Sequence, residues 1–531
     1  MAQSGVRGKA DPAEAATAAP DGRGPSKGGR RGTPRGRGRR VLRWAAILLA
    51  LVILGSAGAG YLYYQHLNDN ITKGERNGGD DSKVHRTQPD AAGRTPLNIL
   101  LIGSDDRNSD ENVKLGGSKD NRGNPPLGDV QMLIHLSADR ESAAMVSIPR
   151  DTRVAIPKCV DPKTKRVYPP TEGIINTTLA RGGAGCTLAT WQQLTGVYID
   201  HWMTIDFTGV VRMADAVGGV EVCVNQNVWD HSTPAQRGGS GLKLTAGKHK
   251  VEGVQALQWL RTRHAWGSDV MRARAQHMYL NSMIRTLKGQ NVFTDSGRLT
   301  DLAEAATKSL VVSKEVGTVK KLYDLGTQLK SVPADRITSV TMPNVEDPLN
   351  REHVVPQQAG ADRLWEMLRD DVPLDKNGKP AKPKPQPSKT ASLQPSRLGV
   401  AVVNGTGSAS RAAVPGRAAD VRAVLARGGY DRAATDTSAA LSEDRTVVRY
   451  PSADLEGDAQ GVAKALGIPL SQVERSTDVS GVTVVVGADW RTGTAYPKKA
   501  APKAGDIPAG SDAINGSDTS ACMDVYKPYQ W

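Results

Sequence analysis

Acidic side chains stand beside two short apolar runs whose composition predicts β-strands. Asp105 comes two residues after the run LNILLIG, and Asp129 directly precedes the run VQMLIHLS. If these strands are neighbours in one sheet, the carboxylates converge and can hold a hard cation. Mg²⁺ typically takes one or two carboxylates plus substrate phosphate oxygens. The alternative is that each aspartate only caps a turn at a strand end.

Arginine residues recur in the same part of the chain. Arg107 follows the first acid by two residues, and Arg150 lies in SIPRDT, after a third apolar run, AAMVSIP. If the segment LRTRH is extended, Arg261 and Arg263 point to one face. Two guanidinium groups side by side suit a diphosphate. The alternative is that these arginines are exposed charges on a solvated face.

The helix predicted after residue 267 favours the anion site. One stripe of this helix, at spacings of four, four, three and four, contains Arg272, Gln276, Leu280, Met283 and Leu287. Because the second half of the stripe is apolar and should be core, we expect Arg272 and Gln276 to point inward too. A buried arginine is costly without an anionic partner. Asp269 could orient Arg272, act as a base, or be an ordinary helix-start acid.

A mixture of strands and helices must position these side chains. Helical patterns over 188–194, 207–217 and 254–260 alternate with the strand-like segments HWMTID and VEVCV. Together with the three apolar runs they predict an α/β domain over residues 96–372. The loop over 104–128 is long and charged, and long loops inside compact domains are often functional.

Two further segments follow this domain. Residues 373–396 are rich in proline and lysine, which predicts an extended linker. Residues 397–490 alternate strand-like and helical patterns, which predicts a second, smaller α/β domain. Residues 491–531 lack such patterns, and we expect a loose tail.

The N-terminus carries much of the net charge of +14. Residues 1–43 are basic and rich in glycine and proline, which predicts disorder. Residues 44–64 contain no charged side chain, and 21 helical residues span a bilayer core. The positive-inside rule then predicts a single transmembrane helix with a cytoplasmic N-terminus, a polar spacer over 65–95 and an exported remainder. A cleaved signal peptide, with Ala57 and Ala59 at the cleavage site, is the alternative.

Composition excludes several classes of protein. With 38% hydrophobic residues the chain is no polytopic membrane protein, and 531 residues are too many for a small disulfide scaffold. The basic tail precedes a membrane helix, so we interpret it as an orientation and lipid-surface signal, with nucleic-acid binding as the alternative.

The four cysteines agree with export. Cys159 and Cys186 flank a segment with turn residues at both ends, and a disulfide between them could stabilise the domain in an oxidising compartment. Cys223 and Cys522 might form a second disulfide, although the sequence alone leaves the connectivity open. The absence of C-x-x-C argues against zinc and thioredoxin chemistry.

The motifs together resemble the LytR-CpsA-Psr family. The resemblance runs in order from about Leu97 to about Leu287 through NILLIGSDDR, GDVQML, VSIPRDT, INTTLARGG, LTGVYIDHWMTIDFTG, DAVGGVEVCV and QALQWLRTRH. Residues 397–490, with VAVVNGTG and VTVVVGADW, resemble the LytR C-terminal domain that often follows in actinobacterial members.

This resemblance implies an activity and assigns roles to residues. It implies a phosphotransferase that moves a glycopolymer from a polyprenyl diphosphate carrier to peptidoglycan outside the membrane, usually onto the 6-hydroxyl of N-acetylmuramic acid. Asp105 and Asp129 would hold Mg²⁺ or Mn²⁺, and Asp105 or Asp269 would accept the proton. The residues that would bind the diphosphate are Arg107, Arg150, Arg261, Arg263, Arg272 and Gln276.

Two positions depart from the family pattern. Leu127 stands where the family often has the arginine of RSD, and Ile174 replaces the lysine of KIN. The anion site would therefore have two cations fewer than usual. A non-catalytic protein that binds polyprenyl diphosphate or the cell wall is the alternative function.

Overall fold

The computed structural model describes residues 36–531 except 80–83, 85, 88, 91, 117–121, 235, 291–294, 381–387, 408–411, 439–441, 444 and 498–501. Most of the predicted basic tail therefore lies outside the described residues. The chain separates into two compact units, Met1–Tyr63 and Tyr64–Trp531.

The first unit is dominated by the long helix α1 (Gly36–Asn70), which continues a few residues into the second unit. Its portion Arg40–Asn70 is long and apolar enough to cross a membrane, and none of its most apolar window is buried. A helix whose apolar residues are exposed all round needs an apolar environment. The predicted span 44–64 lies inside α1, and the helix extends six residues further, through the polar segment that follows.

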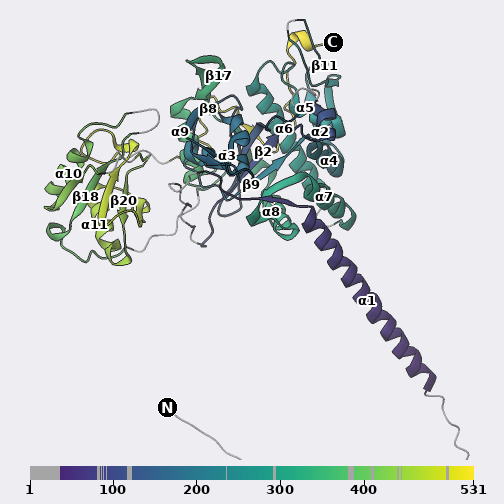
Figure 1. Ribbon diagram of the computed structural model, residues 1–531, viewed down its shortest axis with the longest axis horizontal. Coiled ribbons are helices and arrows are strands. Elements are labelled where there is room, and N and C mark those ends of the chain that lie inside the picture. Colours follow the sequence, from purple (N-terminus) through teal and green to yellow (C-terminus); the bar gives the residue numbers. More distant parts are fainter. Residues whose placement is uncertain are drawn as a thin grey trace, which may run out of the picture. The chain divides into compact units, whose positions relative to one another are not determined.

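A mixed eight-stranded sheet forms the centre of the larger domain of the second unit, in agreement with the predicted α/β domain (Figure 1). The three apolar runs become β2 (Leu97–Ser104), β3 (Gly128–Leu136) and β4 (Ala143–Ser147), which are antiparallel neighbours. In spatial order the strands are β1 (Thr72–Gly74), β14 (Leu310–Ser313), β9 (His201–Ile205), β2, β3, β4, β15 (Ile337–Thr341) and β23 (Ile514–Asn515).

The two faces of this sheet bury different cores because successive side chains of a strand point to opposite faces. Leu100 and Ile102 face a core that includes Trp191 of α3 (Thr178–Thr195) and Trp365 of α9 (Gln358–Arg369). Met132 faces the other core, where α6 (Asp269–Gly289) packs through Leu280 and Ile284. The remaining helices of this domain are α2 (Asp110–Gly116), α4 (Phe207–Val217), α5 (Gly253–Arg261), α7 (Ser296–Ser309) and α8 (Val319–Ser331).

Within the described residues, several two-stranded ribbons complete the domain. They pair β5 (Arg153–Ile156) with β8 (Thr171–Ile174), β6 (Cys159–Val160) with β7 (Val167–Tyr168), β10 (Val220–Val224) with β13 (Gly247–Val251), β11 (Val228–Trp229) with β12 (Lys243–Leu244), and β16 (Asn344–Asp347) with β17 (Asn350–Pro356).

The stretch expected to be a spacer, 65–95, is partly built into this domain. β1 adds a parallel edge strand to the central sheet beside β14, and Gly79 forms a bridge with Cys159. A Cβ atom on Gly185 would lie 2.5 Å from the backbone nitrogen of Gly78, so the two backbones pack tightly. Backbone pairing of this kind needs no apolar periodicity, which is why the sequence pattern did not predict it.

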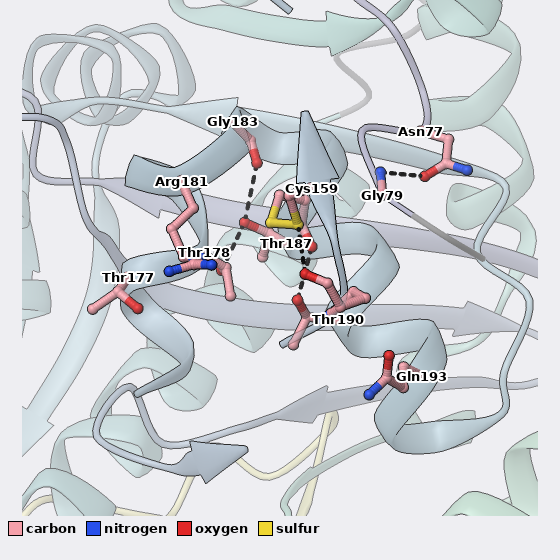
Figure 2. Close-up of a disulfide and its surroundings, with 12 residues drawn as sticks. Asn77, Gly79, Cys159, Thr177, Thr178, Arg181, Gly183, Thr187, Thr190 and Gln193 are labelled. Carbon is pink, nitrogen blue, oxygen red and sulfur yellow. Dashed lines mark hydrogen bonds between the residues drawn. A yellow bond between two sulfur atoms is a disulfide. The ribbon is translucent and has the colours of Figure 1, made fainter. Parts of the chain in front are cut away.

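Both disulfides form. Cys159–Cys186 closes the predicted loop, and Figure 2 shows it beside the N-terminal half of α3 and next to Gly79. Both of its cysteines are fully buried. Cys223–Cys522 joins residues 299 positions apart and settles the connectivity that the sequence left open.

The end of the chain does not form a loose tail. β23 pairs antiparallel with β15 at the edge of the central sheet, and Ile514, Met523 and Tyr529 are buried in the core beside α6. The second disulfide fixes this return. The few apolar side chains of this C-terminal segment are not periodic in sequence because each contacts a different element. No sequence pattern therefore predicted the packing.

The smaller domain has the predicted alternation of strands and helices. Its five-stranded sheet has the order β19 (Ala433–Asp436), β18 (Val400–Asn404), β22 (Val482–Val486), β20 (Val447–Tyr450) and β21 (Val473–Arg475), with α10 (Arg417–Arg427) and α11 (Glu456–Leu466) packed on it. The first linker residues instead belong to the larger domain, since Asp375 is 6% exposed and pairs with Arg336 at 2.9 Å.

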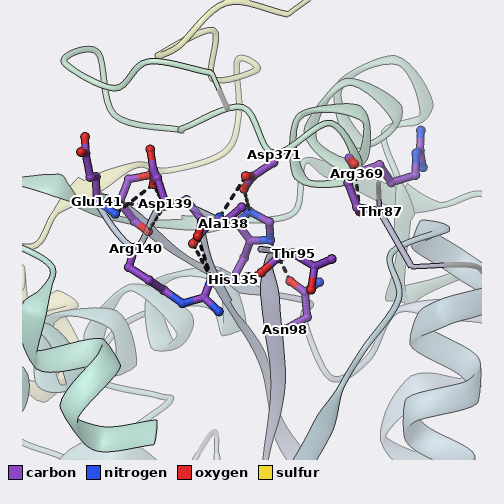
Figure 3. Close-up of polar contacts among 12 residues, drawn as sticks. Thr87, Thr95, Asn98, His135, Ala138, Asp139, Arg140, Glu141, Arg369 and Asp371 are labelled. Carbon is purple, nitrogen blue, oxygen red and sulfur yellow. Dashed lines mark hydrogen bonds and ion pairs between the residues drawn. The ribbon is translucent and has the colours of Figure 1, made fainter. Parts of the chain in front are cut away.

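A buried polar cluster holds the chain that leaves α9 against the central sheet. His135 of β3 contacts Asn98 of β2 through Nδ1 at 2.7 Å and Asp371 through Nε2 at 3.1 Å (Figure 3). Asp371 also accepts a hydrogen bond from the Ala138 backbone at 3.0 Å. His135 is 4% exposed and Asp371 3%. These contacts fix the chain after α9 to the end of the sheet opposite Asp105.

Candidate functional site

The pairing of β2 with β3 brings Asp105 and Asp129 to one edge of the sheet. Ser104 pairs with Gly128, so the acid after β2 and the acid at the start of β3 are neighbours. Asp105 is held by Leu127, whose backbone N–H donates to Oδ1 at 2.6 Å and whose carbonyl accepts from the Asp105 N–H at 3.1 Å. Burial raises the pKa of Asp105, and the charge of Asp129 raises it further.

Arg150 lies at the centre of a group of carboxylates. Its Nη1 is 3.0 Å from Asp129 Oδ1, and its Nε is 3.3 Å from Asp151 Oδ2 and 3.9 Å from Asp269 Oδ1. Burial alone would lower the pKa of Arg150, but the three carboxylates outweigh it and the pKa is raised. Arg150 therefore stays charged and ties the β4 loop to the start of α6.

The inward orientation predicted for Arg272 and Gln276 is confirmed. Arg272 is 7% exposed, donates from Nη2 to the Asp129 carbonyl at 2.7 Å and lies 3.5 Å from Asp269 Oδ1. Burial and the neighbouring Arg150 lower the pKa of Arg272. Gln276 is 4% exposed, and its Nε2 donates to the Leu260 carbonyl at 3.1 Å, which fixes the end of α5.

The extended conformation supposed for LRTRH is wrong. Arg261 is the last residue of α5, and a turn follows in which Gly267 N–H donates to the His264 carbonyl. Arg261 turns inward, donates to the Leu115 and Gly116 carbonyls at 2.7 and 3.1 Å, and lies 4.7 Å from the Phe207 ring centroid. The four orphan carbonyls at the end of a helix accept such donors readily, which explains how α2 captures this guanidinium.

Arg263 remains accessible. Its side chain is 45% exposed and its Nε is 3.5 Å from Asp269 Oδ2. Arg107 has a buried Nε with no hydrogen-bond partner among the described residues. The charge of Arg107 lowers the pKa of Asp105 and that of Arg261, so Arg107 is close to both side chains. A buried donor without a partner is a place where an incoming anion gains a hydrogen bond.

Sequence reasoning missed the role of Asp151. Burial raises its pKa, and the contacts with Asp269 raise it too, against the opposing charge of Arg150. The Asp269 carboxylate thus disfavours the ionised form of Asp151, so Asp151 takes up a proton more readily than an isolated aspartate. Such a pair can exchange a proton with a substrate. The sequence signal that could have identified Asp151 was its position directly after Arg150 in SIPRDT.

The donor set is compatible with a divalent cation that also binds substrate. In the part of the chain that the structure describes, no group of three or more histidine, cysteine or acidic side chains could hold a metal by itself. Asp105 and Asp129 supply two hard oxygen donors, and Mg²⁺ commonly completes such a pair with substrate phosphate oxygens. Burial and the second carboxylate raise the pKa of Asp105, which means that they disfavour its ionised form. A bound cation would stabilise that ionised form.

Family models and relatives match both domains. Residues 61–370 match the model described as LytR_cpsA_psr family, and residues 397–490 match the model described as LytR cell envelope-related transcriptional attenuator. Cell wall biosynthesis protein LcpA of Corynebacterium glutamicum is 28% identical over 58% of this chain. Polyisoprenyl-teichoic acid–peptidoglycan teichoic acid transferase TagT of Bacillus subtilis is 23% identical over 56% of this chain and 87% of its own length.

The coverage differs between relatives. The match spans 60% of LcpA and 46% of the probable cell wall biosynthesis protein LcpB of the same organism. A solved LytR-Csp2A-Psr enzyme from Actinomyces oris is 17% identical, covers 56% of this chain and 95% of its own, and superposes with a TM-score of 0.40. Because the first family model covers more than half of the residues, the chain belongs to the LytR-CpsA-Psr family.

Proposed function

We propose that the protein is a membrane-anchored phosphotransferase that moves a glycopolymer from a polyprenyl diphosphate carrier onto peptidoglycan. The observation that carries this proposal is the group of arginines around Asp105 and Asp129, two of which have donors to spare. The printed names of several relatives, teichoic acid transferases that act between polyisoprenyl-linked teichoic acid and peptidoglycan, support the same class of reaction.

The arginines supply binding and charge stabilisation. Arg107 and Arg263 reach toward the entering diphosphate, while Arg150 and Arg272 hold the acids in place and keep positive charge close by. Transfer forms a phosphodiester to the acceptor hydroxyl and breaks the diphosphate P–O bond, so polyprenyl phosphate leaves. Negative charge grows on the equatorial and leaving oxygens, and fixed cations stabilise it most in a site shielded from water.

Asp105 and Asp129 would hold Mg²⁺ or Mn²⁺. When bound, the ion would supply Lewis-acid polarisation of a phosphoryl oxygen. The protein itself must take the proton of the acceptor hydroxyl. Asp269 is our candidate base, because its Oδ1 has no hydrogen-bond partner among the described residues and the surrounding Arg150, Arg263 and Arg272 hold the carboxylate in place.

The anchoring and orientation follow from α1 and the charge on its flanks. We place the N-terminal tail in the cytoplasm, against the anionic membrane surface, and residues 71–531 outside the cell. The partners are then the membrane, the lipid-linked glycan and peptidoglycan. We expect no nucleic-acid partner.

The direct test is transfer by the purified full-length protein. With Mg²⁺, a polyprenyl-diphosphate-linked glycan and peptidoglycan, it should form a covalent product that a chelator abolishes. Arg263→Ala should lower the rate about a hundredfold, whereas Arg298→Ala, 54% exposed on α7, should not. The proposal fails if no wall glycan is transferred and the Arg263→Ala variant fully restores the phenotype of cells that lack the protein.

The missing cations at Leu127 and Ile174 favour one alternative, a non-catalytic protein that binds the carrier or the cell wall. The commitment of Arg261 to the α2 carbonyls removes a further donor from the supposed anion site. This alternative predicts tight carrier binding that survives Asp129→Ala, with no product under any condition. Native mass spectrometry of the purified protein would show whether a polyprenyl phosphate stays bound.

A further inference from the structure

Three exposed aromatic side chains gather where the end of the chain meets β11. Trp229, Tyr526 and Trp531, here called the aromatic platform, are 40%, 58% and 52% exposed. We propose that the aromatic platform binds the glycan strand of the peptidoglycan acceptor. The inference rests on the proposed transfer function and adds to it the subsite that recognises the acceptor.

The platform is a built feature. The Cys223–Cys522 disulfide fixes the segment 522–531. Next to it, the Met523 N–H donates to the Cys223 carbonyl and the Asn225 N–H donates to the Met523 carbonyl, both at 2.9 Å. Figure 1 shows the C-terminal end beside β11. The exposed rings therefore keep a defined place on the larger domain.

The indole rings are held in fixed orientations. Trp531 donates from Nε1 to the Val228 carbonyl at 3.0 Å. Lys243 places its Nζ 4.8 Å from the Trp229 ring centroid and 4.5 Å from that of Trp531. His231 stacks on Trp229 with centroids 4.2 Å apart. Rings that are both exposed and immobilised lose little conformational entropy when a ligand covers them.

The composition of the patch favours a sugar over a lipid. Within the described residues of 219–254 and 502–531, the exposed large apolar side chains are these three aromatic ones and Val254, the second residue of α5. An interfacial membrane surface also uses leucine and similar side chains. His231 and Lys243 lie over the Trp229 ring and Lys243 lies over one face of Trp531, so Tyr526 and the other face of Trp531 are left for a pyranose, which has apolar C–H faces and hydroxyl edges.

The platform is attached to the loop that carries Arg263. The carbonyl of Ala265 in the loop 262–267 accepts the Tyr526 N–H at 2.7 Å. His264, next to Arg263, has its ring centroid 6.1 Å from that of the buried Tyr529. One short loop therefore joins the platform segment to an arginine that would hold the donor.

The acceptor needs a site of this kind. In the proposed reaction the donor is held by its diphosphate, which the arginines select by charge. A glycan strand of peptidoglycan carries no diphosphate, so those arginines cannot select it. A surface of aromatic rings, which recognises a sugar by stacking, can select the strand.

The test is binding of soluble peptidoglycan glycan strands, freed of peptides, to the full-length protein in detergent, measured by calorimetry without any lipid carrier. Tyr526→Ala and Trp531→Ala should each raise the Kd about tenfold or more, which is about 1.4 kcal/mol. Trp531→Phe should keep most of the affinity. The matched control is Tyr323→Ala, a 43% exposed tyrosine on α8, which should not change it.

The outcomes separate this inference from the proposed function. Glycan binding that Arg263→Ala leaves intact and Tyr526→Ala weakens supports the platform, even if no transfer is ever seen. Unchanged affinity in both platform variants overturns it while leaving the transferase proposal standing. It is also overturned if the variants instead lose binding to phosphatidylglycerol vesicles or change the oligomeric state, since the occupant is then a membrane or a second copy.

Discussion

At the scale of single residues, the arginines of the site differ in what they already contact. Arg261 donates hydrogen bonds to two backbone carbonyls, and its guanidinium group lies over the Phe207 ring. Arg263 is half exposed and has one long contact with Asp269. Similar residues in one short segment therefore divide into one that holds the site together and one that is available to a ligand.

Arg261→Ala should destabilise the protein as well as impair it. The change leaves the Leu115 and Gly116 carbonyls without donors, and an unsatisfied buried group costs about 1–3 kcal/mol. Arg263→Ala should leave stability within about 0.5 kcal/mol of the wild type and lower carrier affinity. Urea unfolding, with carrier binding measured on the same samples, compares the two. Equal unfolding midpoints for both variants would contradict this division.

The raised pKa of Asp105 predicts a dependence on pH and metal. Because the folded-state pKa lies above the unfolded one, the metal-free protein should lose stability as pH rises through that interval. Metal binding needs the ionised form, so affinity for Mg²⁺ should rise over the same interval. At a hundredfold excess over Kd the ion should stabilise by about 2.7 kcal/mol.

Thermal unfolding with and without Mg²⁺ across pH checks this expectation. Asp105→Asn removes the charge that burial penalises, so it should abolish the metal effect and raise the metal-free Tm at neutral pH. Asp139→Asn, remote at the other end of β3, is the control. A Mg²⁺ effect of full size in Asp105→Asn would exclude Asp105 as a ligand.

At the scale of elements, long-range attachments hold the supporting frame. β23 covers the edge of β15, the second disulfide fixes the segment that follows, and β1 covers the opposite edge of the sheet. Covered edges cannot pair with other chains. The His135 cluster joins β2 and β3 to the residue after α9 at the end away from the site.

Replacing Cys223 and Cys522 together by serine should loosen the returning segment. In the chain-entropy model a crosslink over so long a loop stabilises by about 6 kcal/mol, against about 3–4 kcal/mol for Cys159–Cys186. We expect limited proteolysis to cut near residue 520 in the double variant and not in the wild type. Cleavage at equal rates in both would show that packing alone holds the segment.

Asp371→Ala should be strongly destabilising although it lies far from the chemistry. It leaves the buried His135 Nε2 and the Ala138 N–H without their shared partner, and each unsatisfied buried group costs about 1–3 kcal/mol. The exposed neighbour variant Glu141→Ala should change the unfolding free energy by less than about 0.5 kcal/mol. Denaturant unfolding distinguishes them, and a loss under 1 kcal/mol for Asp371→Ala would refute the structural role of the cluster.

At the scale of the whole molecule, charge and hydropathy divide the chain into a basic tail, an apolar helix and the remainder. The basic stretch 1–43 precedes an apolar helix, and the residues proposed to do chemistry all follow it. In the proposed topology the tail serves orientation, and the arginine group beside Asp105 and Asp129 is the positive charge that would act on the substrate.

A topology experiment tests this division. Alkaline phosphatase fused after residue 95 should be active, and the same enzyme fused within residues 1–35 should be inactive, because it folds only in an oxidising compartment. Single cysteines introduced into the tail should resist impermeant thiol reagents in whole cells. Labelling of the tail from outside would reverse the orientation.

The sequence by itself determined the features that depend on local periodicity and composition. The three strands and α1 are continuous apolar runs, and the inward stripe of Arg272 and Gln276 repeats at the helical period, so neighbours in sequence reveal all of them. The two aspartates at the same sheet edge followed from strand ends alone.

Only the tertiary structure decided which distant residues meet. The contact of Asp151 with Asp269, the capture of Arg261 by α2, the Cys223–Cys522 disulfide and the return of β23 join segments far apart in the chain. Each depends on one or two contacts that leave no periodic trace in either segment. Such contacts are specified by the packed core that brings the segments together, and only the fold reveals them.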